Sequence, residues 1–214
     1  MTLKIDFVSD VACPWCAVGL HSLQTALARV SAEIPVELHF QPFELNPAMP
    51  PEGEDTLQHL AKKYGMSLAQ LAQARETLRQ RGAEVGFTFG ERPRIWNTFD
   101  AHRLLHWAAL EGPPNSQRQL KLALLEAYHT HAQNPGAHDV LLRLTAQVGL
   151  DVERASGILA SNEFSEAVRE RERFWQQQGI HSVPAIVIND RHLISGGQPP
   201  EVFEQALRQI AAQG

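Results

Sequence analysis

The chain has 214 residues, of which 43% are hydrophobic and 20% charged, and its net charge at pH 7 is −5. A chain of this length can bury roughly 70% of its unfolded surface, so it can form a core without disulfides or metal ions. The acidic balance leaves no basic surface for a nucleic acid. The first residues, MTLKIDFVSD, show no secretory signal, and no apolar run approaches the length of a membrane span. We therefore expect a cytoplasmic protein with no nucleic acid or membrane partner.

The amino-terminal segment shows the pattern of a strand, a helix and a second strand. Apolar and polar residues alternate over 3–7 and again over 36–40, as is typical of strands. Between these ranges, apolar residues recur at three- and four-residue steps and predict the buried stripe of a helix, formed by Cys16, Leu20, Leu23, Leu27 and Val30. Two strands joined by one helix predict a βαβ unit with parallel strands.

The carboxy-terminal segment predicts two more strands and a last helix. The apolar run Ala185–Ile188 is short enough for a strand that is buried on both faces, and a turn over 189–191 leads to a hairpin partner at 192–195. Pro199 and Pro200 suit the start of the helix. Its inward face is predicted to consist of Val202, Phe203, Ala206, Leu207 and Ile210.

The middle of the chain shows helical periodicity interrupted by turn sequences, with no strand of useful length. The helices predicted there are Leu57–Tyr64, Leu68–Arg81, Asn97–Leu110, Gln117–His131, Val140–Val148, Val152–Leu159 and Glu163–Gln178. The chain is therefore expected to adopt an α/β fold whose terminal segments form the sheet and whose middle is a helical insertion.

The two cysteines of the chain form the sequence CPWC at the predicted start of the first helix. With Cys13 as the N-cap residue, Pro14 occupies the first helical position, where its missing N–H costs nothing. We expect a Cys13 thiolate to accept a hydrogen bond from a backbone N–H of the first turn and to be favoured by the helix dipole. Both effects lower its pKa below the usual value of about 8.5. Cys16 faces the buried side within reach of Cys13, which predicts an attacking and a resolving thiol.

A zinc site and a pair of inert thiols are the other interpretations of these cysteines. A structural zinc ion needs four ligands, and the nearest substitutes for further cysteines are the pairs His102 with His106 and His129 with His131. In a cytoplasmic protein a lone cysteine pair is more often catalytic or metal-binding than a structural disulfide. The position of CPWC between a strand and a helix favours thiol chemistry without a metal.

Pro184 lies at the entrance of the strand 185–188, where a proline removes a hydrogen-bond donor from the sheet. A cis Val183–Pro184 bond would let the Val183 backbone face the Cys13 sulfur and pair with an extended substrate. A trans proline that merely opens an edge strand is the alternative, and only about 5–6% of such bonds are cis. The residues by themselves leave both possibilities open.

Several segments together resemble one protein family. CPWC after the first strand, a helical middle, then SVPAIVIND and ISGGQPPEVFEQAL are similar to the DsbA-like thioredoxin-fold proteins of the FrnE and 2-hydroxychromene-2-carboxylate isomerase group. FQPFELNPAMPPEG, NTFDAHRLLHWA and LLRLTAQVGLD also resemble this group, and the closer match is to FrnE-like cytoplasmic oxidoreductases. The resemblance implies a thioredoxin fold, βαβ plus ββα, formed by residues 1–54 and 179–214 and split by a helical insertion domain over 55–178.

The resemblance also implies roles for individual residues. Cys13 is expected to be the nucleophile, Cys16 the resolving thiol and Pro184 the cis-proline. The isomerase branch and the kappa-class glutathione transferases typically carry serine where Cys13 stands, whereas this chain has both thiols. That difference favours disulfide exchange. The chain also lacks the CPHC sequence of periplasmic DsbA proteins and the second, carboxy-terminal cysteine pair of some FrnE relatives.

Residues flanking the cysteines and a glycine-rich turn are candidates for substrate binding. Pro14 and Trp15 lie beside the Cys13 sulfur, and Val183 is expected opposite it. Gly196, Gly197 and Gln198 precede the last helix, where free backbone N–H groups could hold a carboxylate such as that of glutathione. A turn that needs glycine for its conformation explains the same residues equally well.

Polar residues elsewhere are weaker candidates for the site. Asn97, His102, Arg103 and His106 could line a cleft above Cys13, although a solvated helix face is the favoured interpretation. Glu44 and Asn46 follow the second strand, and a structural role for them is slightly favoured over ligand binding. HRLLH lacks the glutamate of a zinc protease motif, and GFTFG has no phosphate-loop lysine. The aromatic residues Trp96, Phe99 and Trp107 are expected in the core.

The sequence therefore predicts a thiol-disulfide oxidoreductase that uses Cys13 and Cys16 on protein disulfides or small thiols. No bound cofactor is expected, and glutathione is a candidate redox partner or cosubstrate. The alternative is a glutathione-dependent isomerase or transferase of the 2-hydroxychromene-2-carboxylate isomerase or kappa type. A third hypothesis is a chaperone or binding module whose insertion forms an apolar cleft. The residues give neither the direction of electron flow nor the substrate.

Overall fold

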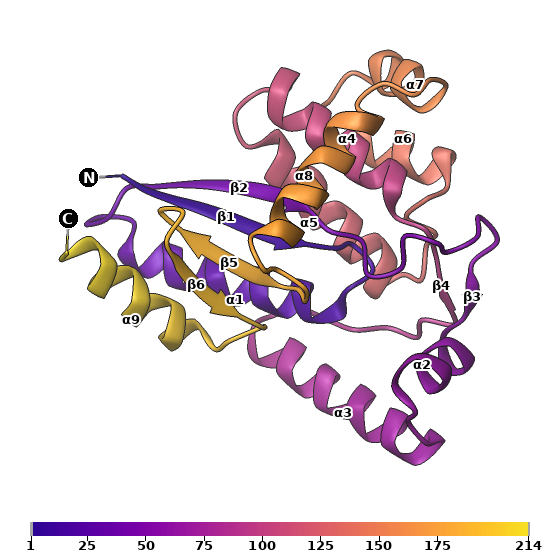
Figure 1. The fold of residues 1–214 in the computed structure, drawn as a ribbon, viewed down its shortest axis with the longest axis horizontal. Coiled ribbons are helices and arrows are strands. Elements are labelled where there is room, and N and C mark those ends of the chain that lie inside the picture. Colours follow the sequence, from indigo (N-terminus) through magenta and orange to yellow (C-terminus); the bar gives the residue numbers. More distant parts are fainter. Residues whose placement is uncertain (1, 214) are drawn as a thin grey trace.

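A four-stranded mixed sheet lies at the centre of the fold (Figure 1). The computed structural model describes residues 2–213, so the outermost residues of the predicted domains, 1 and 214, lie outside it. The strands are β1 (Leu3–Ser9), β2 (Val36–Pro42), β5 (Ala185–Ile188) and β6 (His192–Ser195), in the order β2-β1-β5-β6. β1 runs parallel to β2 and antiparallel to β5, which pairs antiparallel with β6. This is the βαβ plus ββα arrangement expected from the sequence.

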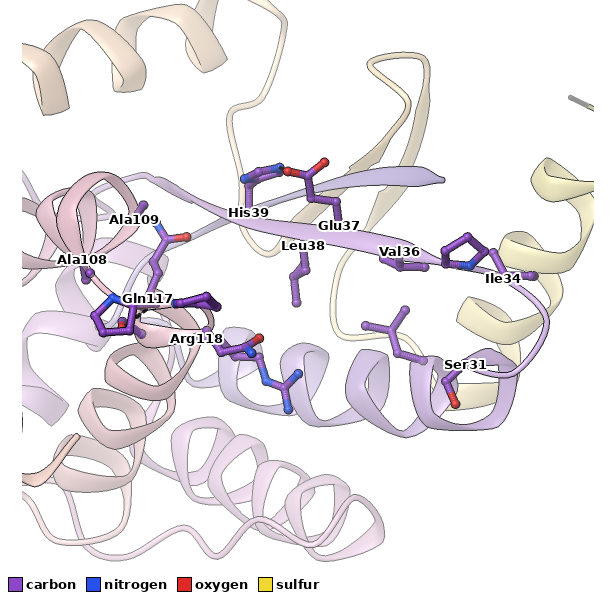
Figure 2. A pocket seen from close by; sticks show the side chains of 17 residues that line it. Ser31, Ile34, Val36, Glu37, Leu38, His39, Ala108, Ala109, Gln117 and Arg118 are labelled. Carbon is purple, nitrogen blue, oxygen red and sulfur yellow. Dashed lines mark hydrogen bonds and ion pairs between the residues drawn. The ribbon is translucent and has the colours of Figure 1, made fainter. Parts of the chain in front are cut away.

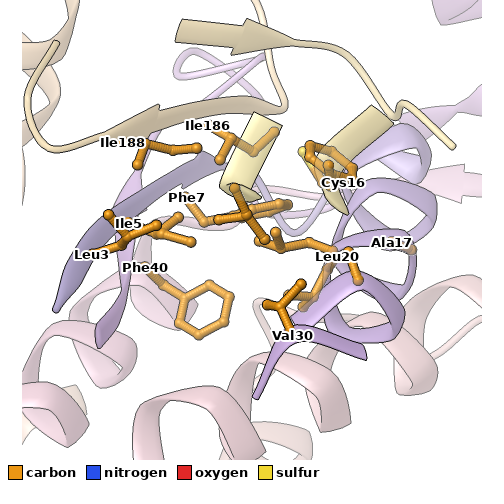
Figure 3. Packing of buried hydrophobic residues seen from close by; sticks show 14 of the residues in the cluster. Leu3, Ile5, Phe7, Cys16, Ala17, Leu20, Val30, Phe40, Ile186 and Ile188 are labelled. Atoms are coloured by element: carbon orange, nitrogen blue, oxygen red, sulfur yellow. The ribbon is translucent and has the colours of Figure 1, made fainter. Parts of the chain in front are cut away.

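Two helices cover one face of the sheet. They are α1 (Pro14–Val30), which connects β1 to β2, and α9 (Pro200–Ala211), which ends the described chain. Figure 3 shows this core, in which alternate residues of β1 meet the apolar stripe of α1. Leu3, Ile5 and Phe7 of β1 and Cys16 and Leu20 of α1 are all fully buried there. The predicted helix stripe thus packs on the predicted strand face, although one expected member of this stripe and one of the inward face of α9 differ.

Leu27 and Val202 are less buried than their apolar character predicts. Leu27 is only partly buried at the edge of the core, and Val202 is 41% exposed. α9 instead packs through Phe203, Leu207 and Ile210, which lie three and four residues apart on one side of the helix. Val202 falls just outside that stripe, because consecutive helix residues are rotated by about 100°.

The other face of the sheet is covered by α8 (Ser165–Gln177), seen in orange across the strands in Figure 1. Trp175 of α8 packs with Val8 of β1 and with Ala185 and Val187 of β5. β5 is therefore buried on both faces, as its continuous apolar run predicted. The division of the chain at residues 55 and 178 into two domains stays a prediction.

Four of the remaining helices build a second core beside the sheet. The remaining helices are α2 (Thr56–Tyr64), α3 (Leu68–Glu84), α4 (Phe99–Glu111), α5 (Ser116–His129), α6 (His138–Gln147) and α7 (Val152–Leu159), and the second core is formed by α4 to α7. Their ends agree with the predicted helices to within three residues. Leu104, Leu124 and Leu141 are among the fully buried residues that join α4, α5 and α6. None of the helices described within residues 2–213 has the length and apolar character needed to cross a bilayer.

Two very short strands lie in the region for which no useful strand was expected. β3 (Glu54–Asp55) and β4 (Arg94–Ile95) pair antiparallel and hold the start of α2 near the start of α4. A two-residue strand cannot show alternation, which is why periodicity does not reveal it.

Candidate functional site

The cysteines lie at the start of α1, after the short loop that connects it to β1. Cys13 is the N-cap residue of α1 in an extended conformation, and Pro14 is the first helical residue, as predicted. Cys13, at the end of the helix, is 4% exposed. Cys16, one turn further along α1, is fully buried in the core of the sheet. Both are free thiols.

As a thiol, the Cys13 side chain makes a different hydrogen bond from the one expected of its thiolate. Its side chain makes no capping hydrogen bond to the first turn of α1. Instead, Cys13 Sγ donates to the carbonyl oxygen of Val183 at 3.5 Å. The physical reason is that a thiol can donate its proton, and the Val183 carbonyl is the acceptor that faces it.

The pKa values of the two thiols shift in opposite directions. The Cys16 side chain, hydrogen bonded to the Cys13 sulfur, lowers the pKa of Cys13; burial opposes this shift, and the backbone N–H groups of Cys16 and Trp15 support it. Burial raises the pKa of Cys16 well above its usual value, and the neighbouring Cys13 raises it further. Cys13 is therefore the thiol that ionises first.

Val183 and Pro184 reach the site from the segment before β5. The Val183–Pro184 peptide bond is cis, the form that the family resemblance implies. Pro184 also packs on α1, because a side chain at Gly19 would meet Pro184 Cγ at 3.1 Å. The sheet and α1 thus bring together two segments that are 170 residues apart in the sequence.

Asp10, in the loop between β1 and α1, is buried and organises the approach to Cys13. Its carboxylate accepts hydrogen bonds from the backbone N–H of Ala12 at 3.0 Å, from the N–H of Leu45 at 2.7 Å and from Thr98 Oγ1 at 2.7 Å. Burial raises its pKa, but hydrogen bonding and charge from His102, together with the backbone donors, outweigh that effect and lower the pKa of Asp10. The carboxylate is therefore a permanent buried anion at neutral pH.

Lys121 supplies a cation on the inner side of the cysteine pair. It lies on α5, is 1% exposed and has its pKa lowered by burial. The negative charges of three neighbours raise its pKa again, in the order Cys16, Asp10 and Cys13. The ammonium group of Lys121 therefore lies near all three. In return, the charge of Lys121 lowers the pKa of Cys16, although burial remains the larger effect. Neither Asp10 nor Lys121 was among the residues predicted from the sequence.

A cavity of about 850 Å³ opens beside Cys13. Pro14, Trp15 and Val183 line it together with Cys13, so these predicted residues lie around one space. Glu44 and Asn46, which follow β2, also contribute to its wall. A volume of this size falls in the range of ligand pockets.

The carboxylate of Glu44 is neutralised by a neighbouring cation. Arg169 of α8 donates a hydrogen bond to Glu44 and another, of 2.8 Å, to Glu172. Burial raises the pKa of both Glu44 and Glu172. Asn46 accepts hydrogen bonds from Lys63 at 2.7 Å and from His59 at 3.1 Å. Both residues therefore tie the cavity wall to the surrounding helices.

The glycine-rich turn uses most of its polar backbone groups internally. Gly196, with a φ of 82°, donates its N–H to Pro184 O at 2.8 Å, and Gln198 donates its N–H to Gly196 O and its side-chain amide to Ser195 O. Gly197 lies against α1, where an added Cβ would meet the Trp15 carbonyl oxygen at 3.0 Å. These residues lie outside the cavity wall, and their role in substrate binding stays a prediction.

The polar residues of α4 do not line the cavity beside Cys13. Asn97 accepts a hydrogen bond from Phe99 N and donates to Met49 O; its role in substrate binding also stays a prediction. The solvated face expected for this helix is wrong, because His102 and Arg103 are buried. Arg103 donates to the carbonyl oxygens that follow α7, and His102 approaches Asp10 at 3.4 Å.

The predicted core aromatic residues are buried to different degrees. Trp107 is 2% exposed and belongs to the helical core, as predicted. Trp96 and Phe99 are only partly buried, and each carries an arginine over its ring, Arg94 and Arg169 respectively. Their partial exposure follows from these cations, whose charged groups stay close to solvent.

A second cavity, of about 620 Å³, lies along the outer edge of β2 (Figure 2). Val36, Leu38 and His39 of β2 face residues at the start of α5, including Gln117. Neither cysteine lines it. Within residues 2–213, no three Cys, His, Asp or Glu side chains gather in a way that could hold a metal ion.

This geometry agrees with the similarity of the chain to known proteins. Residues 4–208 match the model of the DSBA-like thioredoxin domain. The chain belongs to that family. A probable DsbA oxidoreductase from Streptomyces coelicolor shares 33% sequence identity and superimposes with a TM-score of 0.91, over 99% of this chain and 91% of that one. The DSBA-like family identifies the chain as a thiol oxidoreductase in general terms.

Two more distant structures share the DSBA-like fold. A 2-hydroxychromene-2-carboxylate isomerase is 14% identical, with a TM-score of 0.73 over 98% of this chain and 97% of that one. The cytosolic disulfide reductase DsbM from Pseudomonas aeruginosa, solved with GSH, is 18% identical, with a TM-score of 0.65 over 98% and 99% of the two chains. At these identities the similarity establishes the fold alone. The DsbA-like thioredoxin-fold family predicted from the sequence is confirmed by the family model and by the Streptomyces coelicolor relative.

Proposed function

We propose that this DSBA-like protein is a thiol-disulfide oxidoreductase in which Cys13 attacks and Cys16 resolves. The observation that carries the proposal is the opposite environment of the two thiols. Cys13 lies at a cavity wall with a lowered pKa, whereas Cys16 is fully buried with a raised pKa. The thiolate is the reactive form of cysteine, so the first attack falls to Cys13.

In the first step, the Cys13 thiolate attacks one sulfur of a substrate disulfide. A bond forms between Cys13 Sγ and that sulfur, and the substrate's S–S bond breaks to release the other half as a thiolate. The proton that Cys13 gives up leaves the protein or goes to that thiolate. Val183 O, 3.5 Å from Cys13 Sγ, stands on the side from which an extended substrate would approach.

In the second step, Cys16 loses its proton and attacks Cys13 Sγ. The mixed disulfide breaks, the second half of the substrate leaves as a thiolate, and Cys13 and Cys16 become a disulfide. Two electrons have passed from the protein dithiol to the substrate. Lys121 supports this step, because its charge lowers the pKa of Cys16. The reverse sequence oxidises a substrate dithiol.

We further propose glutathione as the redox partner of the Cys13–Cys16 pair. Its support is the DsbM structure, which was solved with GSH. We favour disulfide exchange over the isomerase or transferase reaction, because the chain carries both thiols. A cytoplasmic location stays a prediction from the amino-terminal sequence.

The test compares wild type with Cys13→Ser and Cys16→Ser in the reduction of insulin and of a small disulfide. Cys13→Ser should abolish both reactions. Cys16→Ser should stop after the first step, so the mixed disulfide should accumulate and be visible as added mass on Cys13. Equal rates for wild type and Cys13→Ser would refute the proposed function.

A further inference from the structure

The cavity beside Cys13 has mostly apolar walls, to which α2 and α3 contribute many residues. The two helices follow one another at the lower right of Figure 1. The apolar wall residues include Phe43, Leu57, Leu60, Leu71, Leu78 and Ile95. Apolar walls with a few placed polar groups are the usual composition of a small-molecule pocket.

The Cys13 sulfur is reached from inside this cavity. The residue is only 4% exposed, and its neighbours Pro14 and Trp15 belong to the same wall. A molecule that fits into about 850 Å³ can bring a sulfur atom to Cys13. A volume of this size suits a small substrate.

One wall of the cavity holds a guanidinium group in a fixed position. Arg92 Nη1 donates to the carbonyl oxygen of Ala12, the residue before Cys13, at 3.2 Å, and lies 3.0 Å from His129 Nδ1. His129 Nε2 lies 2.8 Å from Val11 O, which can only accept, so Nε2 carries the proton and Nδ1 accepts from Arg92. Burial, and then the charge of Arg92, lower the pKa of His129 well below its usual value and keep its ring neutral.

Arg92 contacts no carboxylate among the described residues, although the buried Asp10 carboxylate acts on the same His129 and Tyr128 rings. The recorded partners of Arg92 within residues 2–213 are a carbonyl oxygen, the neutral His129 ring and the face of Tyr128, 5.3 Å from the guanidinium carbon. A guanidinium that is partly buried without a carboxylate favours an anionic ligand. Its position beside Ala12 puts that ligand within a short distance of the Cys13 sulfur.

Within residues 2–213, the cavity wall carries one carboxylate, Glu44, which shares Arg169 with Glu172. The other charged side chains of the wall are cationic. Lys63 donates to Leu45 O and Asn46 Oδ1, and Arg75 lies 3.7 Å from Glu91, which does not line the cavity. The space next to Cys13 is therefore apolar in its body and positive at the side of Arg92.

We infer that the cavity binds small disulfides that combine an apolar body with a carboxylate, and that Arg92 binds the carboxylate. This inference rests on the proposed thiol-disulfide exchange and names its substrate class. Bound in this way, the disulfide is attacked by Cys13; its S–S bond breaks, the anionic half forms the mixed disulfide and the other half leaves as a thiolate. Cys16 then attacks Cys13 Sγ and releases the anionic half as a second thiolate. The two electrons come from the protein dithiol, and its two protons are released.

The test uses two aromatic disulfides that differ in charge. Dithiobis(nitrobenzoate) carries carboxylates, whereas dithiodipyridine is neutral at pH 7. The fully reduced protein is mixed with each reagent, and the rate of thiol release is followed by absorbance in a single turnover. Arg92→Gln should lower the rate with the carboxylate reagent about tenfold, as expected for one charge-assisted contact, and change the rate with the neutral reagent less than about twofold.

Arg79→Gln is the matched control. Arg79 lies on α3 and pairs with Glu91 at 2.7 Å. It does not line the cavity beside Cys13. It should leave both rates unchanged. Equal losses with both reagents, or no loss with either, in Arg92→Gln would overturn the inference while leaving thiol exchange intact. Failure of wild type to react with either reagent would instead overturn the proposed function.

A second measurement tests the cavity without any disulfide exchange. Naphthoate, an apolar carboxylate, should slow alkylation of Cys13 by iodoacetamide, whereas acetate at the same concentration should not. Arg92→Gln should weaken protection by naphthoate about tenfold. If acetate protected Cys13 as well as naphthoate does, the apolar wall would contribute nothing to binding. If protection by naphthoate were unchanged in Arg92→Gln, Arg92 would not bind the carboxylate.

Discussion

The two sides of the start of α1 differ more than their three-residue separation suggests. On the outer side, Cys13 meets Val183 O and a cavity, and its pKa is lowered. On the inner side, Cys16 is fully buried near Lys121, and its pKa is raised. Residues i and i+3 of a helix lie one turn apart along its axis, which here takes Cys16 from the cavity into the core. One turn therefore separates the thiol proposed to attack from the thiol proposed to resolve.

The largest expected effect that tests this comparison is the difference in reactivity between the two thiols. In the native, reduced protein, iodoacetamide should modify Cys13 at least ~100-fold faster than Cys16, because alkylation requires an accessible thiolate. The rate at Cys13 should rise with pH around a midpoint below the ordinary pKa of a cysteine thiol. Mass spectrometry of peptides after timed quenching measures both rates.

Cys13→Ser provides the control for this measurement. Its remaining thiol, Cys16, should resist alkylation in the native protein and react readily once guanidinium has unfolded the chain. Comparable labelling of Cys13 and Cys16 in the native protein would show that the two sides of α1 do not differ as described.

The next effect concerns Asp10, the buried anion whose hydrogen bonds fix the backbone next to Cys13. Asp10→Asn should lower the free energy of unfolding at pH 7 by about 2–3 kcal/mol, because the amide cannot replace a charged acceptor of the Ala12 and Leu45 N–H groups. The pKa of Asp10 in the fold lies below 3.8, so the carboxylate stabilises the fold above that pH. This contribution is lost as the pH falls through the folded pKa, so the difference between wild type and variant should shrink.

Urea unfolding at several pH values between neutrality and strong acid measures this difference. Asp139→Asn, at an exposed position in the first turn of α6, is the matched control and should change stability by less than about 0.5 kcal/mol. Asp10→Asn should also lower the pKa of Cys13 slightly, because the charge of Asp10 raises it. A constant difference across the whole pH range would argue against an ionised Asp10.

The smallest effect is expected from the cation on the inner side. Lys121→Met should raise the pKa of Cys16 further and slow the release of a mixed disulfide about threefold to tenfold at pH 7. The first attack by Cys13 should change less. Stability should not fall, because removing an ammonium group from a buried site also removes its desolvation cost. Stopped-flow measurement of the two phases separates the steps, and a selective loss in the first phase would contradict this role.

Much of the fold could be predicted because its elements have regular apolar periods. The strand run 185–188, the helix stripe that contains Cys16 and the seven helices of 55–178 all carry such patterns, and their ends lie close to the predicted ones. CPWC at a helix start likewise predicts its own local geometry. The two-residue strands β3 and β4 carry too few residues for any period and were missed.

The residues of the site that were missed come from distant elements. Asp10 precedes CPWC by three residues but shows no pattern of its own, and Arg92 lies in a loop after α3. For Lys121, the spacing along the helix could have indicated that it faces the site. It lies four residues before Leu125, which belongs to the core of the sheet, and eight before His129, so one face of α5 carries Lys121, Leu125 and His129 toward the cysteines.

The sequence by itself therefore determined the elements, the position of the cysteine pair at a helix start and the family, because these depend on local periodicity and on neighbouring residues. Only the tertiary structure decided what surrounds the pair. It places Val183, Lys121 and Arg92, which are far apart in the chain, around Cys13 and Cys16. Burial and charge at those sulfur atoms arise from such distant contacts, and no short stretch of sequence contains them.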